Sequence, residues 1–531
     1  MRRILRIRRL CTLAMALTLA AFLPGMALAS PGHLPIHVRQ GLVGGASDGK
    51  VEAFLGIPYA APPVGAYRWR PPRPAKTWRG TRDARQFGAS CWQPVDPKGF
   101  GPWTHEYVVQ DAVSEDCLFL NIWRPVRPAE RLPVLVWIHG GGFMAGSGSV
   151  PIYNGRNLAA RGVIVVTLNY RLGALGFLAH PEITRETPAG GAPGNFGLQD
   201  QIAALRWLRT NVAAFGGDPG RITLAGQSAG AMSVHALVTS PLAKGLFSAA
   251  IAQSGPPTRS MPTPDLAAAE RDGLAFGQEK GASTLKDLRG LRPEQLNVGK
   301  MGGLRFVPIS DGVLLPRSVP DMSAAGQFND VPMIVGQTAD DGVSLGLAPG
   351  PLSAAAYQKT LSGYFGEMAP EFAAVYPAAD ELQRASATRQ IRIDRGLATI
   401  LDWAQDRARS GRSPIYAYLF SHVEPGAGSS LWGSFHSSEI PYVFDTLEAA
   451  PERTFTRQDH QVMLAISTYW LNFVRTGNPN GAGQPIWPAL DPANPEMIDF
   501  GAKTVALPLI QPARLHLYRR FLAQGGTVSL F

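Results

Sequence analysis

Short apolar runs recur along the chain and are separated by amphipathic or polar segments. Four of these runs cover residues 132–138, 163–168, 222–225 and 331–335, and they are rich in Val, Ile and Leu. Runs of this length with consecutive apolar residues are typical of strands that are covered on both faces, as in a parallel sheet. The pattern therefore predicts a large central sheet that is mostly parallel.

The segment 198–214 shows the periodicity of an amphipathic helix. Leu198, Ile202, Leu205 and Val212 recur at helical spacing, and a Gly-Gly-Asp-Pro sequence follows. Glycine and proline end helices, because glycine adopts the left-handed cap and proline lacks the backbone N–H. We expect one buried helix here, between two of the predicted strands.

Three further segments are predicted as helices, over residues 264–300, 352–411 and 458–475. The first two are more polar and rich in Ala, so we expect them to form a helical cap over one edge of the sheet. Strands that alternate with helices indicate an α/β fold with helices on both faces of the sheet.

The N-terminal part of the mature chain has a different pattern. Residues 38–59 alternate and contain Gly-Gly and Asp-Gly turns, which predicts a small antiparallel sheet. Residues 60–110 are rich in Pro, Gly and Trp and are expected to form an ordered loop. No linker interrupts the chain after this point, so residues 30–531 are predicted to form a single catalytic domain.

The first residues have the composition of a secretory signal peptide. Five arginines lie within the first nine residues, an apolar run covers 10–23, and Ala-Leu-Ala ends at Ala29. A basic start, an apolar centre and a small-x-small end predict a signal peptide over 1–29 and an exported protein, periplasmic or secreted. An uncleaved membrane anchor and a twin-arginine signal at Arg8-Arg9 stay open as alternatives.

Cleavage would change how the charge and the cysteines are interpreted. The five arginines account for half of the net charge of +10, and no other basic cluster stands out, so neither nucleic-acid binding nor stable membrane insertion is expected of the mature protein. Cys11 would leave with the signal peptide, while Cys91 and Cys117 remain. In an oxidising compartment these two are expected to form a disulfide, with two free thiols as the alternative. A metal site is not expected.

A Gly-Gln-Ser-Ala-Gly sequence directly follows the apolar run 222–225 and places Ser228 between Gly226 and Gly230. Such a serine lies in a tight turn from a strand to a helix, where bulkier neighbours would collide. The helix that begins near Ala229 directs its N-terminus toward the reacting atoms. We therefore expect Ser228 to be a nucleophile.

A second motif, His-Gly-Gly-Gly, begins at His139 and also follows a buried run. Consecutive glycines leave backbone N–H groups free to face a substrate oxygen, which an oxyanion hole requires. No lysine follows the glycines, which disfavours a phosphate-binding loop. The expected donors are the N–H groups of Gly141, Gly142 and Ala229.

These two motifs, together with Ser-Glu-Asp-Cys-Leu-Phe-Leu-Asn at 114–121 and Trp-x-Asn-Phe-x-x-Thr-Gly-Asn-Pro-Asn at 470–480, resemble the type B carboxylesterases and lipases. This family includes the cholinesterases, and the resemblance spans roughly residues 36–520. It implies an α/β-hydrolase fold, and it supports the pairing of Cys91 with Cys117.

The resemblance also implies which residues complete a catalytic triad. It points to His436 as the base, whereas His139 is expected to brace the glycine loop and His235 to pack within a helix. The family usually has a Glu as the acid, and the matching residue here is Asp341, with Asp340 as the alternative. A shorter carboxylate can still orient the imidazole if its loop lies closer.

Other positions are assigned supporting roles. Ser254 matches a residue that supports the triad through hydrogen bonds, while Glu115 and Asp116 are expected to form structural ion pairs near the disulfide. Aromatic residues, together with the helical cap, are candidates for the lining of the acyl and alcohol pockets: Trp92, Trp103, Phe143 and Trp432.

The sequence thus predicts a serine hydrolase that cleaves small-molecule carboxylic esters through an acyl-enzyme, without a cofactor. One alternative keeps the chemistry but changes the bond to an amide, carbamate or thioester. The other is a catalytically silent binding module, because a fold does not imply a function.

Overall fold

A computed structural model describes residues 35–128, 131–260, 263–296, 306–346 and 353–530 of the 531-residue chain. The predicted signal peptide, residues 1–29, lies outside the described residues. The part from Pro35 onward forms one compact unit, to which the following description refers.

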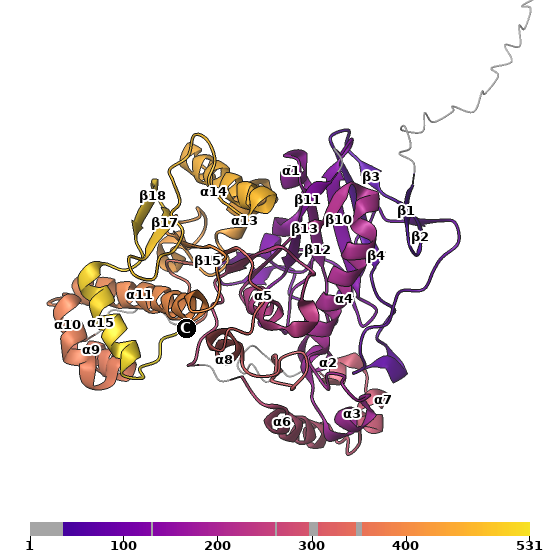
Figure 1. Cartoon of the computed structure of the whole chain (residues 1–531), viewed down its shortest axis with the longest axis horizontal. Coiled ribbons are helices and arrows are strands. Elements are labelled where there is room, and N and C mark those ends of the chain that lie inside the picture. Colours follow the sequence, from indigo (N-terminus) through magenta and orange to yellow (C-terminus); the bar gives the residue numbers. More distant parts are fainter. Residues whose placement is uncertain (1–34, 129–130, 261–262, 297–305, 347–352, 531) are drawn as a thin grey trace, which may run out of the picture. The chain divides into compact units, whose positions relative to one another are not determined.

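A large mixed sheet runs through this unit (Figure 1). Its eleven strands are, in spatial order, β18 (Thr504–Pro508), β17 (Glu496–Phe500), β16 (Ile415–Phe420), β15 (Met333–Thr338), β14 (Ala249–Gln253), β13 (Gly217–Gln227), β11 (Leu132–Ile138), β12 (Ile164–Leu168), β10 (Phe119–Pro125), β4 (Val51–Pro58) and β3 (Ala46–Ser47). The strands from β17 to β12 are all parallel, whereas β18, β10 and β3 pair antiparallel with their neighbours. The predicted mostly parallel sheet is confirmed.

The sheet separates two hydrophobic cores, because alternate side chains of a strand point to opposite faces. In β11, Val134, Val136 and Ile138 belong to one core, while Leu135 and Trp137 belong to the other. All five are at most 2% exposed, which explains why this strand has no polar position and was recognisable as an apolar run.

Helices cover both faces, as expected (Figure 1). The first core includes residues of α4 (Phe196–Asn211), α5 (Ala229–Thr239) and α11 (Glu381–Ala408). The second core includes residues of α1 (Arg156–Ala160), α13 (Ile440–Phe444) and α14 (Arg457–Thr476). The remaining helices are α2 (Gly173–Phe177), α3 (Pro181–Glu186), α6 (Leu266–Glu279), α7 (Leu285–Gly290), α8 (Val319–Ala324), α9 (Ala354–Phe365), α10 (Ala369–Val375), α12 (Ser429–Trp432) and α15 (Pro512–Ala523).

Helix α14 illustrates how local sequence sets the bounds of an element. The side chain of Thr456 accepts a hydrogen bond from the N–H of Asp459, and Asp459 reciprocates as a capping box. At the other end Gly477 has φ 74°, a left-handed conformation that glycine adopts without strain. The predicted helix 458–475 therefore begins and ends within two residues of its expected bounds.

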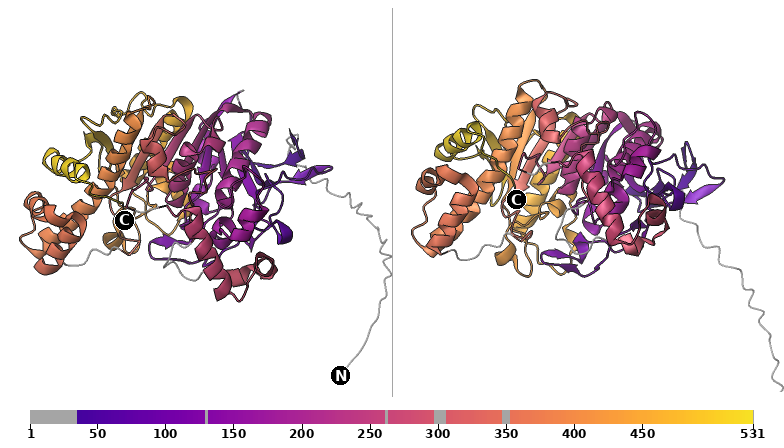
Figure 2. Two further views of the ribbon diagram at one scale, coloured as in Figure 1. Left: turned by 60° about the horizontal axis from the view of Figure 1, so that its bottom comes forward. Right: turned by 90° about the horizontal axis from the view of Figure 1, so that it is seen from below.

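The helices of the segment 352–411 lie in two different places. Helix α11 packs against β15, since the N–H₂ group of Gln337 donates to the carbonyl of Ile393 at 3.1 Å. A Cβ on Gly396 would lie 1.9 Å from Oε1 of Gln337, so only glycine permits this approach. Helices α9 and α10 lie farther out with α15, at the end of the large sheet opposite to the small N-terminal sheet (Figure 2).

The small sheet has three strands, β1 (Ile36–Val38), β2 (Gly41–Gly44) and β5 (Thr81–Asp83). Strands β1 and β2 are antiparallel as predicted, but β5 pairs parallel to β2. The later part of the predicted segment, β4, belongs to the large sheet. Four more short strands pair further along, three of them within the region 60–110 that was expected as loop: β6 (Ser90–Cys91) with β9 (Val113–Ser114), and β7 (Gly99–Phe100) with β8 (Trp103–Thr104).

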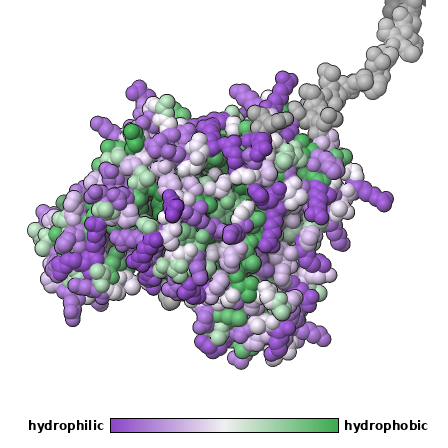
Figure 3. Space-filling model, in the orientation of Figure 1, coloured by the Kyte–Doolittle hydropathy of each residue, from purple (hydrophilic) through white to green (hydrophobic). Residues whose placement is uncertain are grey.

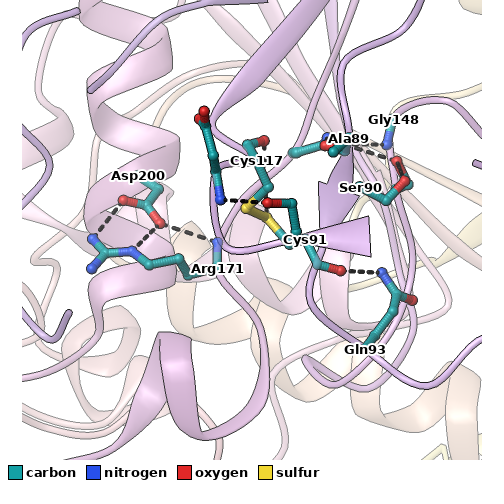
Figure 4. Close-up of a disulfide and its surroundings, with 12 residues drawn as sticks. Ala89, Ser90, Cys91, Gln93, Cys117, Gly148, Arg171 and Asp200 are labelled. Carbon is teal, nitrogen blue, oxygen red and sulfur yellow. Dashed lines mark hydrogen bonds and ion pairs between the residues drawn. A yellow bond between two sulfur atoms is a disulfide. The ribbon is translucent and has the colours of Figure 1, made fainter. Parts of the chain in front are cut away.

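The predicted disulfide between Cys91 and Cys117 is present and buried (Figure 4). It closes the segment that contains the strands β6 to β9. The amide of Gln93 donates to the carbonyls of Cys91 at 2.9 Å and Gly146 at 2.8 Å, and its oxygen accepts the N–H of Gly146 at 2.7 Å. The closed segment is thereby connected to the loop that follows the three glycines.

Most large apolar side chains are inside, and Leu382 and Ile486 are among the exposed ones. Hydrophilic side chains spread over the face shown in Figure 3, with smaller hydrophobic areas between them. Among the helices of the described residues, none combines the length and the apolar character that a membrane crossing requires.

Removal of the disulfide tests how much the closed segment depends on it. We expect the Cys91→Ser/Cys117→Ser variant to lose about 3–4 kcal/mol of unfolding free energy, because the cross-link over a separation of 26 residues restricts the unfolded chain. Urea unfolding would measure this, with reduced wild-type protein as the control. An unchanged free energy of unfolding would contradict the expectation.

Candidate active site

Ser228 occupies the turn between β13 and α5. Its backbone has φ 57° and ψ −126°, a conformation that is strained for a residue with a Cβ. Its N–H donates to the carbonyl of Gln253 at 2.9 Å, and its carbonyl accepts the N–H of Met232 at 2.9 Å. The neighbouring strand and the following helix together hold the turn in place.

The two flanking glycines are required by close backbone contacts. A Cβ on Gly226 would lie 2.6 Å from the backbone of Gly230, and a Cβ on Gly230 would lie 2.1 Å from the carbonyl oxygen of Ile138. Neither distance is possible for a real side chain, because the contact atoms belong to the backbone. The structure thus agrees with the reason given for these glycines from the sequence.

The glycine loop lies directly against this turn. A Cβ on Gly140 would approach the Cβ of Ser228 to 3.0 Å. Gly141 and Gly142 have φ 108° and 62°, which glycine alone adopts easily. Ala229 is the first residue of α5, where backbone N–H groups lack intrahelical acceptors. The three expected donors therefore come from two segments that meet at Ser228.

His139 and His235 are placed as expected for packed residues. His139 is buried, its Nδ1 lies 2.8 Å from the carbonyl oxygen of Gly140, and its ring stacks on Tyr170 at 4.4 Å. Burial lowers the pKa of His139 to about 4 and that of His235 to about 3. His235 packs edge-on against Trp403 in the core. Both imidazoles stay neutral at physiological pH.

His436 lies in the segment between β16 and α13 and is 3% exposed. Its Nδ1 is hydrogen-bonded to Oδ1 of Asp341, the residue matched to the acid. The other carboxylate oxygen of Asp341 accepts the N–H of Thr338 at 3.1 Å. A carboxylate at Nδ1 keeps the proton on that nitrogen, which leaves Nε2 as the acceptor.

The Nε2 atom of His436 faces the turn that contains Ser228. The amide nitrogen of Gln227, the residue before Ser228, lies 3.1 Å from it and donates to it. This contact was not predicted from the sequence. Gln227 lies between Gly226 and Ser228 in the Gly-Gln-Ser-Ala-Gly sequence. The contact joins the imidazole to the residue that precedes Ser228, across a sequence separation of 209 residues.

Asp340, the alternative acid, is engaged elsewhere. Its carboxylate accepts hydrogen bonds from Arg389 at 2.5 and 2.9 Å and from the N–H of Ser434 at 2.9 Å. The N–H of Asp340 in turn donates to the carbonyl of Ser434 at 3.0 Å. Asp340 thus holds the backbone that leads into His436, whereas Asp341 contacts the ring.

A buried acid that the sequence analysis did not single out lies behind the pair. Glu439 accepts a hydrogen bond from the amide of Gln253 at 3.0 Å, and Tyr418 donates to the same oxygen at 3.4 Å. Burial, with a further contribution from Asp341, raises the pKa of Glu439 to about 7. The only signal in the sequence was its position three residues after His436.

Ser254 lies at the end of β14, beneath the nucleophile turn. It has φ 52°, and its N–H donates to the carbonyl of Gly336 at 2.8 Å. A Cβ on the next residue, Gly255, would lie 2.7 Å from the carbonyl oxygen of Ser228. The hydroxyl of Ser254 is buried and makes no hydrogen bond to any residue in the described part of the chain.

The candidate lining residues have different environments. Phe143 is 1% exposed and packs against Phe177, so it belongs to the core. Trp103 and Trp432 are partly exposed, and the indole N–H of Trp103 donates to the carbonyl of His436 at 3.1 Å. Trp92 is also partly buried, and its indole nitrogen has no hydrogen-bond partner among the described residues.

Two clusters of charged side chains form structural ion pairs. Glu115 forms a bidentate pair with Arg68, at 2.6 and 2.8 Å, close in sequence to the disulfide. Within the described residues, metal-binding donor atoms gather in one place, on His105, Glu106 and Glu452, within 4.8 Å of one another. Glu106 is already ion-paired with Arg453 at 2.9 Å, and this positive charge opposes a cation there.

Comparisons with known proteins agree with this geometry. Residues 33–513 match the model of the carboxylesterase family. The fumonisin B1 esterase of Sphingopyxis macrogoltabida is 36% identical over 502 residues, which covers 91% of this chain and 89% of the relative. The phenmedipham hydrolase of Pseudarthrobacter oxydans is 36% identical over 503 residues, which covers 90% and 97%.

Solved structures point to the same family. A PNB esterase superposes with a TM-score of 0.76 at 32% sequence identity, which covers 92% of this chain and 99% of that structure. The match extends over the large sheet and its helices, so the expected α/β-hydrolase fold is confirmed. The chain therefore belongs to the carboxylesterase family and is a carboxylic ester hydrolase.

Proposed function

We propose that the protein hydrolyses carboxylic esters with Ser228 as nucleophile, His436 as general base and Asp341 as the orienting acid. The observation that carries this assignment is the position of His436. Its Nδ1 is bonded to Asp341, and its Nε2 is 3.1 Å from the amide of Gln227, which immediately precedes Ser228. The proposed base thus contacts the proposed acid through one ring nitrogen and the neighbour of Ser228 through the other, which supports a triad of the kind that acyl transfer uses.

The reaction follows from this placement. His436 takes the proton of Ser228 on Nε2 while the serine oxygen attacks the acyl carbon. The N–H groups of Gly141, Gly142 and Ala229 stabilise the oxyanion, each by about 3–4 kcal/mol as in other hydrolases. His436 then protonates the departing alcohol, and water repeats the sequence and releases the acid.

The strained turn at Ser228 and the neutral state of the nearby imidazoles support the same assignment. A positive φ exposes the serine hydroxyl at the carboxyl end of the sheet, where the backbone donors gather. His139 cannot serve as the base, because Gly140 and Tyr170 fix its ring within the core. The supporting hydrogen bond expected of the Ser254 hydroxyl is not found among the described residues, and the carbonyl of the preceding residue, Gln253, accepts the N–H of Ser228 instead.

The substrate is proposed to be a small-molecule carboxylic ester, and no cofactor takes part in the steps above. Phenmedipham, which the named relative hydrolyses, is a carbamate, and this favours carbamates as a second substrate class. The same triad attacks both, because an ester and a carbamate each offer an acyl carbon with a departing alcohol or phenol.

Export is proposed from two independent features. The N-terminal residues 1–29 have the composition of a signal peptide, and the disulfide between Cys91 and Cys117 is a bond that persists in oxidising compartments. After cleavage, residues 30–531 would act as a single catalytic domain in the periplasm or outside the cell.

The nucleophile is tested by Ser228→Ala. We expect the variant to hydrolyse p-nitrophenyl esters from acetate to laurate at less than about a thousandth of the wild-type rate, because the acyl-enzyme cannot form. Wild-type protein, followed at 405 nm under the same conditions, is the reference, and circular dichroism checks the fold. A variant that retains activity would refute the assignment.

The acid is tested by a matched pair of variants. Asp341→Asn should lower kcat about 10⁴-fold, because an amide at this place allows the wrong imidazole tautomer. Asp340→Asn keeps that contact and loses the charge opposite Arg389, so its main effect should be on thermal stability. If the larger loss of kcat appeared in Asp340→Asn, the two roles would have to be exchanged.

Glu439 makes stability depend on pH in a defined direction. Burial raises its pKa from the ordinary 4.5 to about 7, so the folded protein holds a proton that the unfolded chain releases. Its contribution to stability is present below pH 4.5 and is lost, by about 3 kcal/mol, as the pH rises to about 7. Urea unfolding of Glu439→Gln from pH 5 to 8 should show a weaker fall than wild type, and equal slopes would contradict this.

A further inference from the structure

The segment that contains His436 is also held by the indole of Trp103. The N–H of this indole donates to the carbonyl of His436 at 3.1 Å, across a separation of 333 residues. The ring also meets the ring of Phe435 edge-on at 6.4 Å, and Phe435 precedes His436 in the chain. The position of the base therefore depends on the position of Trp103.

Trp103 lies in a segment that is exposed in part and has little regular structure. The strands β7 and β8 form a two-residue ladder, and residues 105–107 form a single 3₁₀ turn. These two short elements cannot fix the indole by themselves. With so few backbone hydrogen bonds, the free energy needed to open the segment locally is small. A further side chain must therefore fix the position of residues 102–107.

Arg453 fixes this segment, and its side chain is 9% exposed. It donates to Glu106 at 2.9 and 3.1 Å and to the hydroxyl of Thr104 at 2.7 Å. Thr104 donates in turn to Glu106 at 2.6 Å, so the residues after Trp103 are bound to each other and to Arg453.

The same guanidinium also ties this segment to the one that follows β16. It donates to the carbonyl of Pro425 at 3.1 Å and lies 3.6 Å from a carboxyl oxygen of Glu424. Tyr107 donates to Glu424 at 2.7 Å and thereby closes the connection from the other side. Arg453 thus fastens residues 102–107 to residues 424–425, and the segment with His436 begins a few residues further along the chain.

The charges in this cluster point to Glu106 as the main counter-ion. Burial, with Glu106 and Asp459 nearby, raises the pKa of Glu424 to about 8, so Glu424 is protonated at neutral pH. The partly exposed ring of His105 lies 3.3 Å from Glu106 and 3.6 Å from Glu452. A buried ion pair of this kind is weak as a source of stability but specific in geometry.

We propose that Arg453 is a positioning residue for ester hydrolysis, which acts through Trp103 on the backbone of His436. The inference rests on the proposed role of His436 as base. Arg453 orders the segment 102–107, Trp103 then caps the carbonyl of His436, and the imidazole is held at its distance from Ser228. Displacement of a base by about 1 Å costs up to a hundredfold in rate.

A double-mutant cycle on kcat tests this proposal. Arg453→Met removes the charge and the donors but keeps an unbranched apolar stem, and Trp103→Phe keeps a ring but removes the N–H. We expect each variant to lower kcat for p-nitrophenyl acetate about 10-fold, with the KM of Arg453→Met within twofold of wild type. The double variant should be no slower than the slower single variant, because both changes break one connection.

Controls separate positioning from damage to the fold. Each kcat is divided by the concentration of sites that a phosphonate inhibitor labels, so unfolded protein does not contribute. Arg453→Lys should recover kcat to within about threefold, since the charge beside Glu106 is restored. Arg514→Met is the matched control, because Arg514 pairs with the buried Asp394 at 2.7 Å and lies over the ring of Tyr376. It should lower stability without lowering kcat.

The outcomes are distinct. Losses that multiply to about 100-fold in the double variant, or a kcat of Arg453→Met within twofold of wild type, would overturn the proposal while leaving the triad intact. If Arg453→Met does not fold, Trp103→Phe alone decides, and an unchanged kcat would overturn it. A wild-type protein that neither hydrolyses esters nor reacts with the phosphonate would instead refute the proposed function itself.

Discussion

Ser228 holds a positive φ at the end of a buried strand, and the surrounding elements are packed so that this conformation persists. The carbonyl of Gln253 accepts its N–H, and the backbones of Gly226 and Gly230 approach too closely for any side chain. A strained residue of this kind costs of order 1–3 kcal/mol and survives only where its neighbours fix it. The glycine loop, the start of α5 and the approach of His436 all depend on the place where this turn leaves the sheet.

The parallel strands explain why the other site residues reach the same place. Ser228, Ser254, Asp341 and His436 follow β13, β14, β15 and β16, which are neighbours in this order in the sheet. The carboxyl ends of parallel strands lie at one edge, so residues from four distant parts of the sequence meet there. The remaining distance between strand ends is bridged by side chains, Asp341 to His436 and Gln227 to His436.

The sequence predicted those features that follow from local patterns. The apolar runs gave four of the parallel strands, and the glycine motifs gave the turn and the loop, because each is determined by consecutive residues. Strand β14 escaped recognition because three of its five residues are Ala, which carry little strand preference. The choice between Asp340 and Asp341 could not be made from adjacent, identical side chains. In the structure Asp340 bonds to Arg389, whereas Asp341 bonds to His436.

The contacts that hold the segment of His436 could not be predicted from the sequence either, because consecutive residues do not determine them. Trp103 lies 333 positions before His436, and Arg453 belongs to a different loop. Neither residue is part of a recognisable motif. A buried ion pair such as that of Arg453 with Glu106 loses hydration on folding, and apolar residues of similar size would often stabilise a fold as well. A guanidinium fork, however, fixes direction as well as distance, since its donors are coplanar. The pair of Arg389 with Asp340 restrains residues 434–436 through the N–H of Ser434, and the pair of Arg453 with Glu106 does so through Trp103. No strand or helix contains these residues, and this makes geometry rather than stability the reason for charges in these places.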